Sequence, residues 1–294
     1  VYDELHRRYP DKPFLAGEWC ATPTTRGWYA PDDPEKGRVF AGDHDPHNGF
    51  SAAREDTAAF VRARTWVAGG FQWVGVEHRG ECKWPRLCSA SGAVDLFLLK
   101  KDAYYQNQTL LRTEPRVHIL GHWNAPADGA KIVPVWVYAR ADRVELFLNG
   151  ASLGTRDTCD GRHAEWQAPY APGELRAVGY KEDAPVCEDV RHTTGKPVKL
   201  HLIPVEPDMP LFTCECLDEA GRTVPDAAPY VRFRAEGGVR ILATGSDNAD
   251  PIPPAVPERQ MYMGQIAVYA RVSASGALIA EADGLVPARY EIRA

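Results

Sequence analysis

The stretch KPFLAGEW, residues 12–19, decides how the first part of the chain is interpreted. Its apolar run is broken by Gly17 and then ends in a carboxylate, Glu18, beside Trp19. A short apolar run bounded by turn residues is typical of a buried strand. We therefore predict a strand over 13–17 that carries a charged group at its carboxyl end.

Strands and helices alternate downstream of this stretch. Residues 51–67 predict a helix that is capped by Ser51, and 69–76 (GGFQWVGV) predict a second buried strand. A closing helix follows at 100–112. The predicted apolar stripe of the first helix comprises Ala59, Phe60, Ala63 and either Trp66 or Val67. This alternation predicts parallel βα units, and two such units need further parallel strands beside them, from another chain or a longer polypeptide.

After Glu114 the pattern changes to short strands with period-two alternation. Asn149-Gly150 separates two such strands and predicts a hairpin, because a type I′ turn needs two residues that tolerate positive φ. A small β-sandwich is expected here, with a core filled by Trp123, Trp136 and Trp166. Lys196-Pro197 marks a boundary before a second sandwich of the immunoglobulin type.

Composition narrows the class of protein. The 294 residues are 44% apolar and carry a net charge of -6, without runs of Lys or Arg. This charge argues against nucleic acid or an anionic membrane as a partner. The seven cysteines form no C-x-x-C pair, and Cys214 and Cys216 lie two apart on a predicted strand, too far apart for easy bridging. We therefore expect free thiols and a reducing, cytoplasmic location.

Polar and aromatic residues gather where the two predicted parallel strands end. Active sites of parallel α/β barrels lie at the carboxyl ends of the strands, which places Glu18 as a catalytic group. Indoles stack on sugar rings and carboxylates act at the anomeric carbon, so the pattern suits a carbohydrate site. The second strand end supplies Gln72, Trp73, Glu77, His78, Arg79 and Glu81. An equally weighted interpretation of Glu18 is a simple ion pair with an arginine.

Several segments in this order resemble the C-terminal part of glycoside hydrolase family 2, of the β-galactosidase type. They are KPFLAGEW, TRGWY, GGFQWVGVEHRGE, SGAVDLFLLKKDAYYQNQ, VHILGHWN and VWVYARADRVELFLNGASLG. The resemblance implies the last two βα units of a TIM barrel over 1–113, followed by immunoglobulin-like sandwiches over 114–195 and 196–294. It also implies that Glu18 is the nucleophile of a retaining glycosidase and that Trp73 lines the sugar subsite. The family's acid/base is a Glu after an Asn, and this chain has no Asn-Glu dipeptide.

The remaining candidate residues keep two interpretations each. Arg26 either binds substrate or braces Glu18, and Trp84 either carries a sugar or packs. With these, the expected substrate-binding residues are Trp19, Arg26, Trp73, Glu77, His78, Glu81 and Trp84. Asp95 and Asp102 are expected as helix caps. His44, Asp45 and His47 are read as a turn and not as a metal site, so we expect no metal and no cofactor.

The expected reaction is hydrolysis of terminal β-galactosides. A β-glucuronide or β-galacturonide is the alternative substrate, although the chain has no Asn-x-Lys triplet of the kind associated with glucuronidases. A non-catalytic carbohydrate-binding or accessory protein is the alternative from another class. The expected partners are a carbohydrate and an N-terminal remainder of the enzyme, and assembly of several copies is left open.

Overall fold

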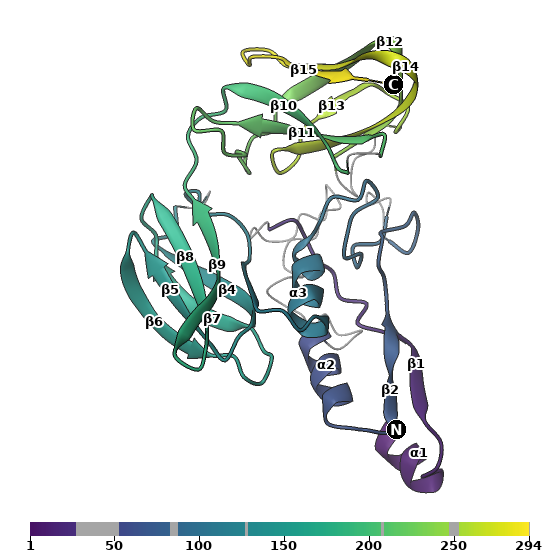
Figure 1. The fold of residues 1–294 in the computed structure, drawn as a ribbon, viewed down its shortest axis with the longest axis vertical. Coiled ribbons are helices and arrows are strands. Elements are labelled where there is room, and N and C mark those ends of the chain that lie inside the picture. Colours follow the sequence, from purple (N-terminus) through teal and green to yellow (C-terminus); the bar gives the residue numbers. More distant parts are fainter. Residues whose placement is uncertain (28–52, 83–87, 127–128, 207–208, 247–252, 294) are drawn as a thin grey trace.

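The computed structural model describes residues 1–27, 53–82, 88–126, 129–206, 209–246 and 253–293. Its chain forms an N-terminal part with helices and two all-β modules (Figure 1). The elements of the N-terminal part are α1 (Tyr2–Arg8), β1 (Phe14–Trp19), α2 (Arg54–Arg62), β2 (Val67–Gln72) and α3 (Asp102–Leu111). None of the helices in these described ranges is long and apolar enough to cross a membrane.

Strands β1 and β2 are parallel neighbours, as the sequence predicts. They form a two-stranded sheet in which Phe14 faces Val67 and Trp19 faces Gln72. Leu15 and Phe71 on this sheet are 58% and 64% exposed. A parallel sheet is normally covered on both faces, so this one has the character of a piece of a larger sheet.

Helix α2 forms within the predicted range 51–67 but ends at Arg62, and it buries a different face from the one predicted. It begins at Arg54, and the predicted cap Ser51 lies outside the described residues. The buried residues of the helix are Arg54, Glu55 and Thr57, whereas Phe60 is only partly buried. The predicted stripe is therefore wrong, because the polar face is covered: Glu55 accepts hydrogen bonds from His163 in the first β module.

The first β module contains two sheets that share one core. One sheet has the order β3 (Arg116–Ile119), β4 (Ile132–Arg140), β7 (Ala164–Pro169), and the other β6 (Ala151–Asp157), β5 (Arg143–Leu148), β8 (Glu174–Lys181), β9 (Ala184–His192). Trp123 and Trp166 fill this core as predicted. Trp136 does not, because it points to the other face of β4 and stacks on His163 with ring centroids 3.9 Å apart.

The Asn149-Gly150 hairpin is confirmed between β5 and β6. Both residues have positive φ, 50° for Asn149 and 82° for Gly150, as a type I′ turn requires. The Asn149 side chain also joins the next turn, because it donates to the Pro172 carbonyl and accepts from the Glu174 amide.

The second β module is one curled sheet and not two separate ones. Its strands are β10 (Lys199–Pro204), β11 (Leu211–Leu217), β12 (Tyr230–Gly245), β13 (Glu258–Gln260), β14 (Gln265–Glu281) and β15 (Ala288–Ile292). They follow the order β10-β11-β14-β12-β13, with β15 beside β14. The two long strands β12 and β14 bend at register shifts after Gly237 and Ile241 and enclose a single core. Because these strands run through both layers, the two layers of this module belong to one continuous sheet.

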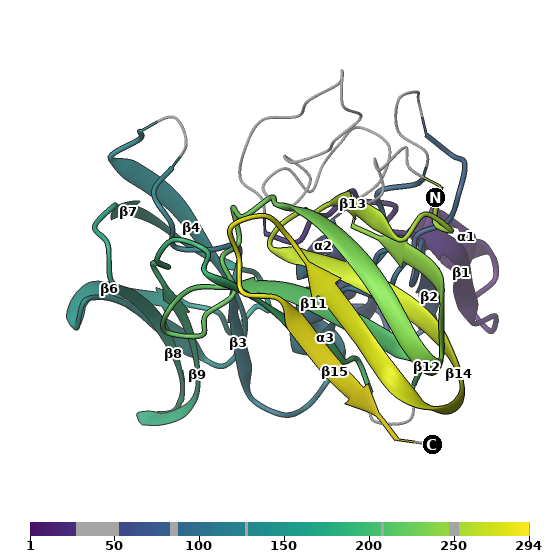
Figure 2. The ribbon, with the colours of Figure 1, turned by 90° about the horizontal axis from the view of Figure 1, so that it is seen from above.

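Both β modules contact the N-terminal part, and Figure 2 shows the three parts from above. A Cβ atom on Gly27 would lie 2.6 Å from the Gly121 Cα atom, so the two backbone segments touch there. Leu99 packs with Leu211 and Ala267 of the second module. Between the two β modules, Asn124 Nδ2 donates to Asp226 Oδ1 over 2.9 Å. These contacts bring the three parts together around one junction.

The hairpin offers a direct test of the backbone assignment. Gly150→Val places a β-branched side chain at φ 82°, and we expect a loss of about 1–2 kcal/mol in the free energy of unfolding. Gly195→Ala is the control, because its new Cβ atom would meet nothing closer than 3.6 Å. Urea denaturation measures both, and equal stability of the two variants would contradict the turn assignment.

Candidate functional site

Glu18 lies at the carboxyl end of β1 with an exposed side chain. The next residue, Trp19, is laid against the neighbouring strand, since a Cβ atom on Gly70 would come within 2.5 Å of the Trp19 ring. Beyond β2, the Trp73 amide donates to the Trp19 carbonyl over 2.9 Å. The two strand ends are thus fixed side by side, and Gly70 leaves room for the indole.

Three predicted site residues meet where β2 ends, and we call Trp73, His78 and Glu81 the strand-end cluster. Glu81 Oε2 accepts a hydrogen bond from Trp73 Nε1 over 3.1 Å and lies 3.2 Å from His78 Nε2. The His78 and Trp73 rings meet edge to face with centroids 5.4 Å apart. Ser89 Oγ lies 3.2 Å from His78 Nδ1. The carboxylate therefore fixes the orientation of an indole and an imidazole beside Glu18's strand.

Glu77 was expected to bind substrate, and its position contradicts this. The residue is 3% exposed and forms an ion pair with the buried Lys101 ammonium. Lys101 Nζ also donates to the Ala90 carbonyl over 2.9 Å. A carboxylate at this depth ties the end of β2 to the start of α3, which favours a structural role over substrate binding.

Arg26 does not turn toward Glu18 as a brace. Its Nη2 atom donates to the Ser246 carbonyl and, over 3.1 Å, to the Tyr262 carbonyl. The guanidinium also lies 5.2 Å from the centre of the Tyr262 ring. Arg26 therefore anchors the N-terminal part to the second β module, and these contacts do not support either role predicted for it.

Some predicted residues cannot be placed. Trp84 and the loop with His44, Asp45 and His47 lie outside the described residues. Asp95 and Asp102 are not helix caps: α3 has Lys101 at its N-cap, and Asp95 Oδ1 instead accepts the Phe97 and Leu99 amides of its own loop.

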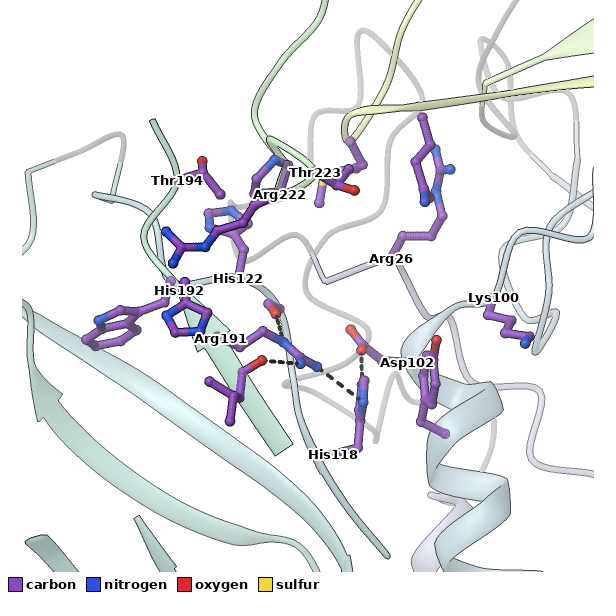
Figure 3. Close-up of a pocket in the computed structure, with 17 residues that line it drawn as sticks. Arg26, Lys100, Asp102, His118, His122, Arg191, His192, Thr194, Arg222 and Thr223 are labelled. Carbon is purple, nitrogen blue, oxygen red and sulfur yellow. Dashed lines mark hydrogen bonds and ion pairs between the residues drawn. The ribbon is translucent and has the colours of Figure 1, made fainter. Parts of the chain in front are cut away.

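Sequence reasoning missed a buried polar group at the junction of the three parts. His118 Nε2 lies 2.6 Å from Asp102 Oδ1, and Arg191 Nη2 lies 3.3 Å from His118 Nδ1 (Figure 3). Arg191 also donates to the Ile119 carbonyl over 2.6 Å and to Asp189 Oδ1 over 2.7 Å. Since Arg191 can only donate, His118 Nδ1 is the acceptor and Nε2 carries the proton toward Asp102.

Burial shifts the pKa values of both partners in the Asp102–His118 hydrogen bond. It raises the pKa of Asp102 to about 7 and lowers the pKa of His118 to about 3, where Arg191 adds to the effect. At the neighbouring contact, burial opposes ionisation of Glu55, but the hydrogen bonds from His163 keep its pKa below the usual range. The junction therefore holds a neutral imidazole, while Glu55 stays ionised.

Comparison with known proteins identifies the class of enzyme to which the relatives of this chain belong. The chain is 32% identical over 269 residues to beta-galactosidase BoGH2A of Bacteroides ovatus, covering 83% of this chain and 31% of that protein. It is 26% identical to a beta-glucuronidase of Formosa agariphila, covering 79% of this chain and 25% of that protein. A domain of unknown function, DUF4982, matches residues 130–187 in the first β module. The sequence relatives are thus glycoside hydrolases.

Solved structures agree on the fold. A beta-glycosidase from Bacteroides vulgatus matches all of this chain with a TM-score of 0.86 at 24% identity, over 43% of its own length. A glycosyl hydrolase family 2 member from Bacteroides cellulosilyticus matches 99% of it with a TM-score of 0.78, over 39% of its length. The chain is a homologue of glycoside hydrolase family 2 proteins and corresponds to a C-terminal portion of them, which confirms the resemblance seen in the sequence. It spans between a quarter and a third of the length of these curated relatives.

Replacing Lys101 tests the structural role of Glu77. Lys101→Met leaves a buried carboxylate without its ammonium partner, so we expect a loss of about 3–5 kcal/mol in the free energy of unfolding. Lys100→Met, at the exposed neighbouring position, should change it by less than about 0.5 kcal/mol. Adding Glu77→Gln to Lys101→Met should recover part of the loss, and a double variant no more stable than the single one would contradict the pairing.

The Asp102–His118 pair predicts an unusual dependence of stability on pH. Between pH 4 and 6.5, approximately, the folded chain holds one proton on Asp102 and none on His118. The unfolded chain, with ordinary pKa values of 3.8 and 6.5, holds one on His118 and none on Asp102. Both states bind equally many protons, so the intact pair adds no slope in this range.

Removing either residue of the pair should reveal the pH dependence of stability that the other residue causes. In Asp102→Asn the lowered pKa of His118 acts alone, and stability falls as the pH drops below 6.5, by up to about 1.4 kcal/mol per pH unit relative to the parent chain. In His118→Gln the raised pKa of Asp102 acts alone, and stability is lost as the pH rises toward 7. Urea midpoints from pH 4.5 to 8 measure both, and slopes of the same sign would show that the pair is not coupled in this way.

Proposed function

We propose that the complete protein is a retaining glycoside hydrolase that cleaves terminal β-galactosides, with Glu18 as its nucleophile. The observation that carries the proposal is the exposed Glu18 carboxylate at the carboxyl end of β1, parallel to and beside the end of β2. Such an end is where α/β barrels keep their catalytic groups. The relatives named as glycosidases support the same class of reaction.

The proposed reaction has two steps. The Glu18 carboxylate attacks the anomeric carbon and forms a glycosyl ester while the aglycone oxygen leaves with a proton from a second carboxylic acid. That second group then takes a proton from water, which attacks the ester and releases the sugar. In retaining enzymes the two carboxyl groups stand about 5–5.5 Å apart. We assign the acid/base to the N-terminal remainder of the enzyme, because no Asn-Glu dipeptide is present in this sequence.

The strand-end cluster suits a neutral sugar. Trp73 offers an indole whose orientation is held by the hydrogen bond to Glu81, and indoles stack on the C–H faces of pyranose rings. The Glu81 carboxylate beside it would repel the carboxylate of a uronic acid. This favours a β-galactoside over a β-glucuronide or β-galacturonide. Hydrolysis of a β-glucuronide or β-galacturonide is the second candidate function, because one relative is named a beta-glucuronidase.

Replacing Glu18 tests the assignment in the complete polypeptide. Glu18→Gln keeps the side-chain volume but removes the attacking charge, so hydrolysis of an aryl β-galactoside should fall by several orders of magnitude. Azide should restore part of the turnover and give a product of inverted configuration, because it attacks from the face that Glu18 has vacated. Glu4→Gln, the same change on exposed helix α1, is the control and should keep full activity.

Covalent labelling decides between the candidate carboxylates. A 2-deoxy-2-fluoro-β-galactoside should label the peptide that contains Glu18, and the corresponding glucuronide should label it more slowly. A label on Glu77 or Glu81 would refute Glu18 as nucleophile, and a faster reaction with the glucuronide would refute the neutral sugar. Sugar binding without turnover or label would identify an accessory protein.

A further inference from the structure

A pocket of about 500 Å³ lies where the N-terminal part meets both β modules (Figure 3). This volume falls within the range of ~300–1,000 Å³ that small-molecule sites occupy. Its lining comes from all three parts: Arg26, Asp102 and Tyr105 from the first, His118, Arg191 and His192 from the second, and Arg222 and Thr223 from the third. Neither Glu18 nor the strand-end cluster lines it. The junction pocket is therefore separate from the proposed catalytic centre.

Two polar atoms at the junction pocket lack a hydrogen-bond partner among the described residues. Asp102 is 4% exposed, and its Oδ2 atom has none, while Oδ1 is used by His118. Arg26 Nη1 is likewise buried without one, while Nη2 binds the two carbonyls of the second β module. A buried polar atom without a partner costs roughly 1–3 kcal/mol, so both atoms favour a ligand that supplies the missing bonds.

The chemistry of the lining selects the kind of ligand. The Arg191 guanidinium is already committed to carbonyl oxygens and Asp189. Lys100 lies over the Tyr104 ring, and Arg222 is exposed. Apart from Arg26 Nη1, the buried group that remains for a ligand is an acceptor, Asp102 Oδ2, which repels an anion when ionised. A molecule with several hydroxyl groups suits both atoms, because one hydroxyl can donate to Asp102 while another accepts from Arg26. The half-buried Tyr105 adds a further hydroxyl and an aromatic ring.

We propose that the junction pocket is a second carbohydrate site, which binds a neutral sugar through Asp102 Oδ2 and Arg26 Nη1. The inference goes beyond the proposed hydrolysis and does not need turnover. A sugar bound here touches residues from all three parts and holds them together. It gives the protein a means to retain a glycan chain away from the position where a terminal residue is cleaved.

Hydrogen exchange of the whole protein at pH 8 tests the proposal with galactose, which has no glycosidic bond to cleave. At this pH Asp102 is mostly ionised, since its pKa is about 7. Galactose should slow exchange in 118–123 and 190–194, the backbone around the pocket. Asp102→Asn replaces Oδ2 by a donor while it keeps an acceptor for His118, and we expect it to weaken this protection by about tenfold or more.

Asn107→Leu is the control. Asn107 lies on α3 like Asp102, and its Oδ1 atom also lacks a hydrogen-bond partner among the described residues, but it does not line the junction pocket, so protection should be unchanged. If Asp102→Asn proves unstable, His192→Trp serves instead, because it fills the pocket without removing a bond from the Asp102–His118 pair. The variant should also abolish protection.

Three results would overturn the inference. Protection by galactose confined to 14–19 and 67–82 would place sugar at the strand ends alone. Stronger protection of the pocket by inorganic phosphate than by galactose would make it an anion site. Unchanged binding in both pocket variants would exclude the pocket. None of these results depends on labelling of Glu18, so the two proposals can fail separately.

Discussion

The contact between helix α3 and strand β3 is the constraint on which the arrangement of the molecule depends. His118 and Asp102 meet at 2.6 Å in a buried position, and the residue that starts α3 is thereby tied to the first β module. The same helix start holds the segment that leaves β1: the Asp102 amide donates to the Thr25 carbonyl, and the Ala103 amide to Thr24 Oγ1. The path from Glu18 to the first β module therefore runs through a few directed hydrogen bonds. Because such bonds tolerate little displacement, they set the position of the strand ends more sharply than apolar packing alone would.

Local signals in the sequence were sufficient for the elements themselves. Asn149-Gly150 predicts its hairpin because few residue pairs accept two positive φ values, and the βα alternation predicts the parallel pair β1 and β2. The free cysteines follow from spacing, since Cys214 and Cys216 both point into the core from one strand. These features depend on neighbouring residues only, and the sequence contains that information directly.

Contacts between distant segments could not be predicted in the same way. Glu55 and His163 are separated by 108 positions, and nothing around Glu55 distinguishes a buried carboxylate from a solvated one. Glu77 looked like a ligand group because it follows a strand, yet its partner Lys101 lies 24 residues further on. Arg26 was expected to bind substrate or to brace Glu18 through its opposite charge, whereas its partners lie more than 200 positions away. In each case the local sequence does not indicate which distant segment of the chain packs over the residue.

The two long strands of the second β module have a consequence for how this module loses its structure. Strands β12 and β14 pair along most of their length and serve both layers of the curled sheet, with Gly237 facing Gly276 where they bend. One layer cannot separate from the other unless these strands break within their own ladder. The module is thus expected to unfold as one cooperative unit, without a stage in which half of it persists, and a force applied across its ends would meet a single barrier.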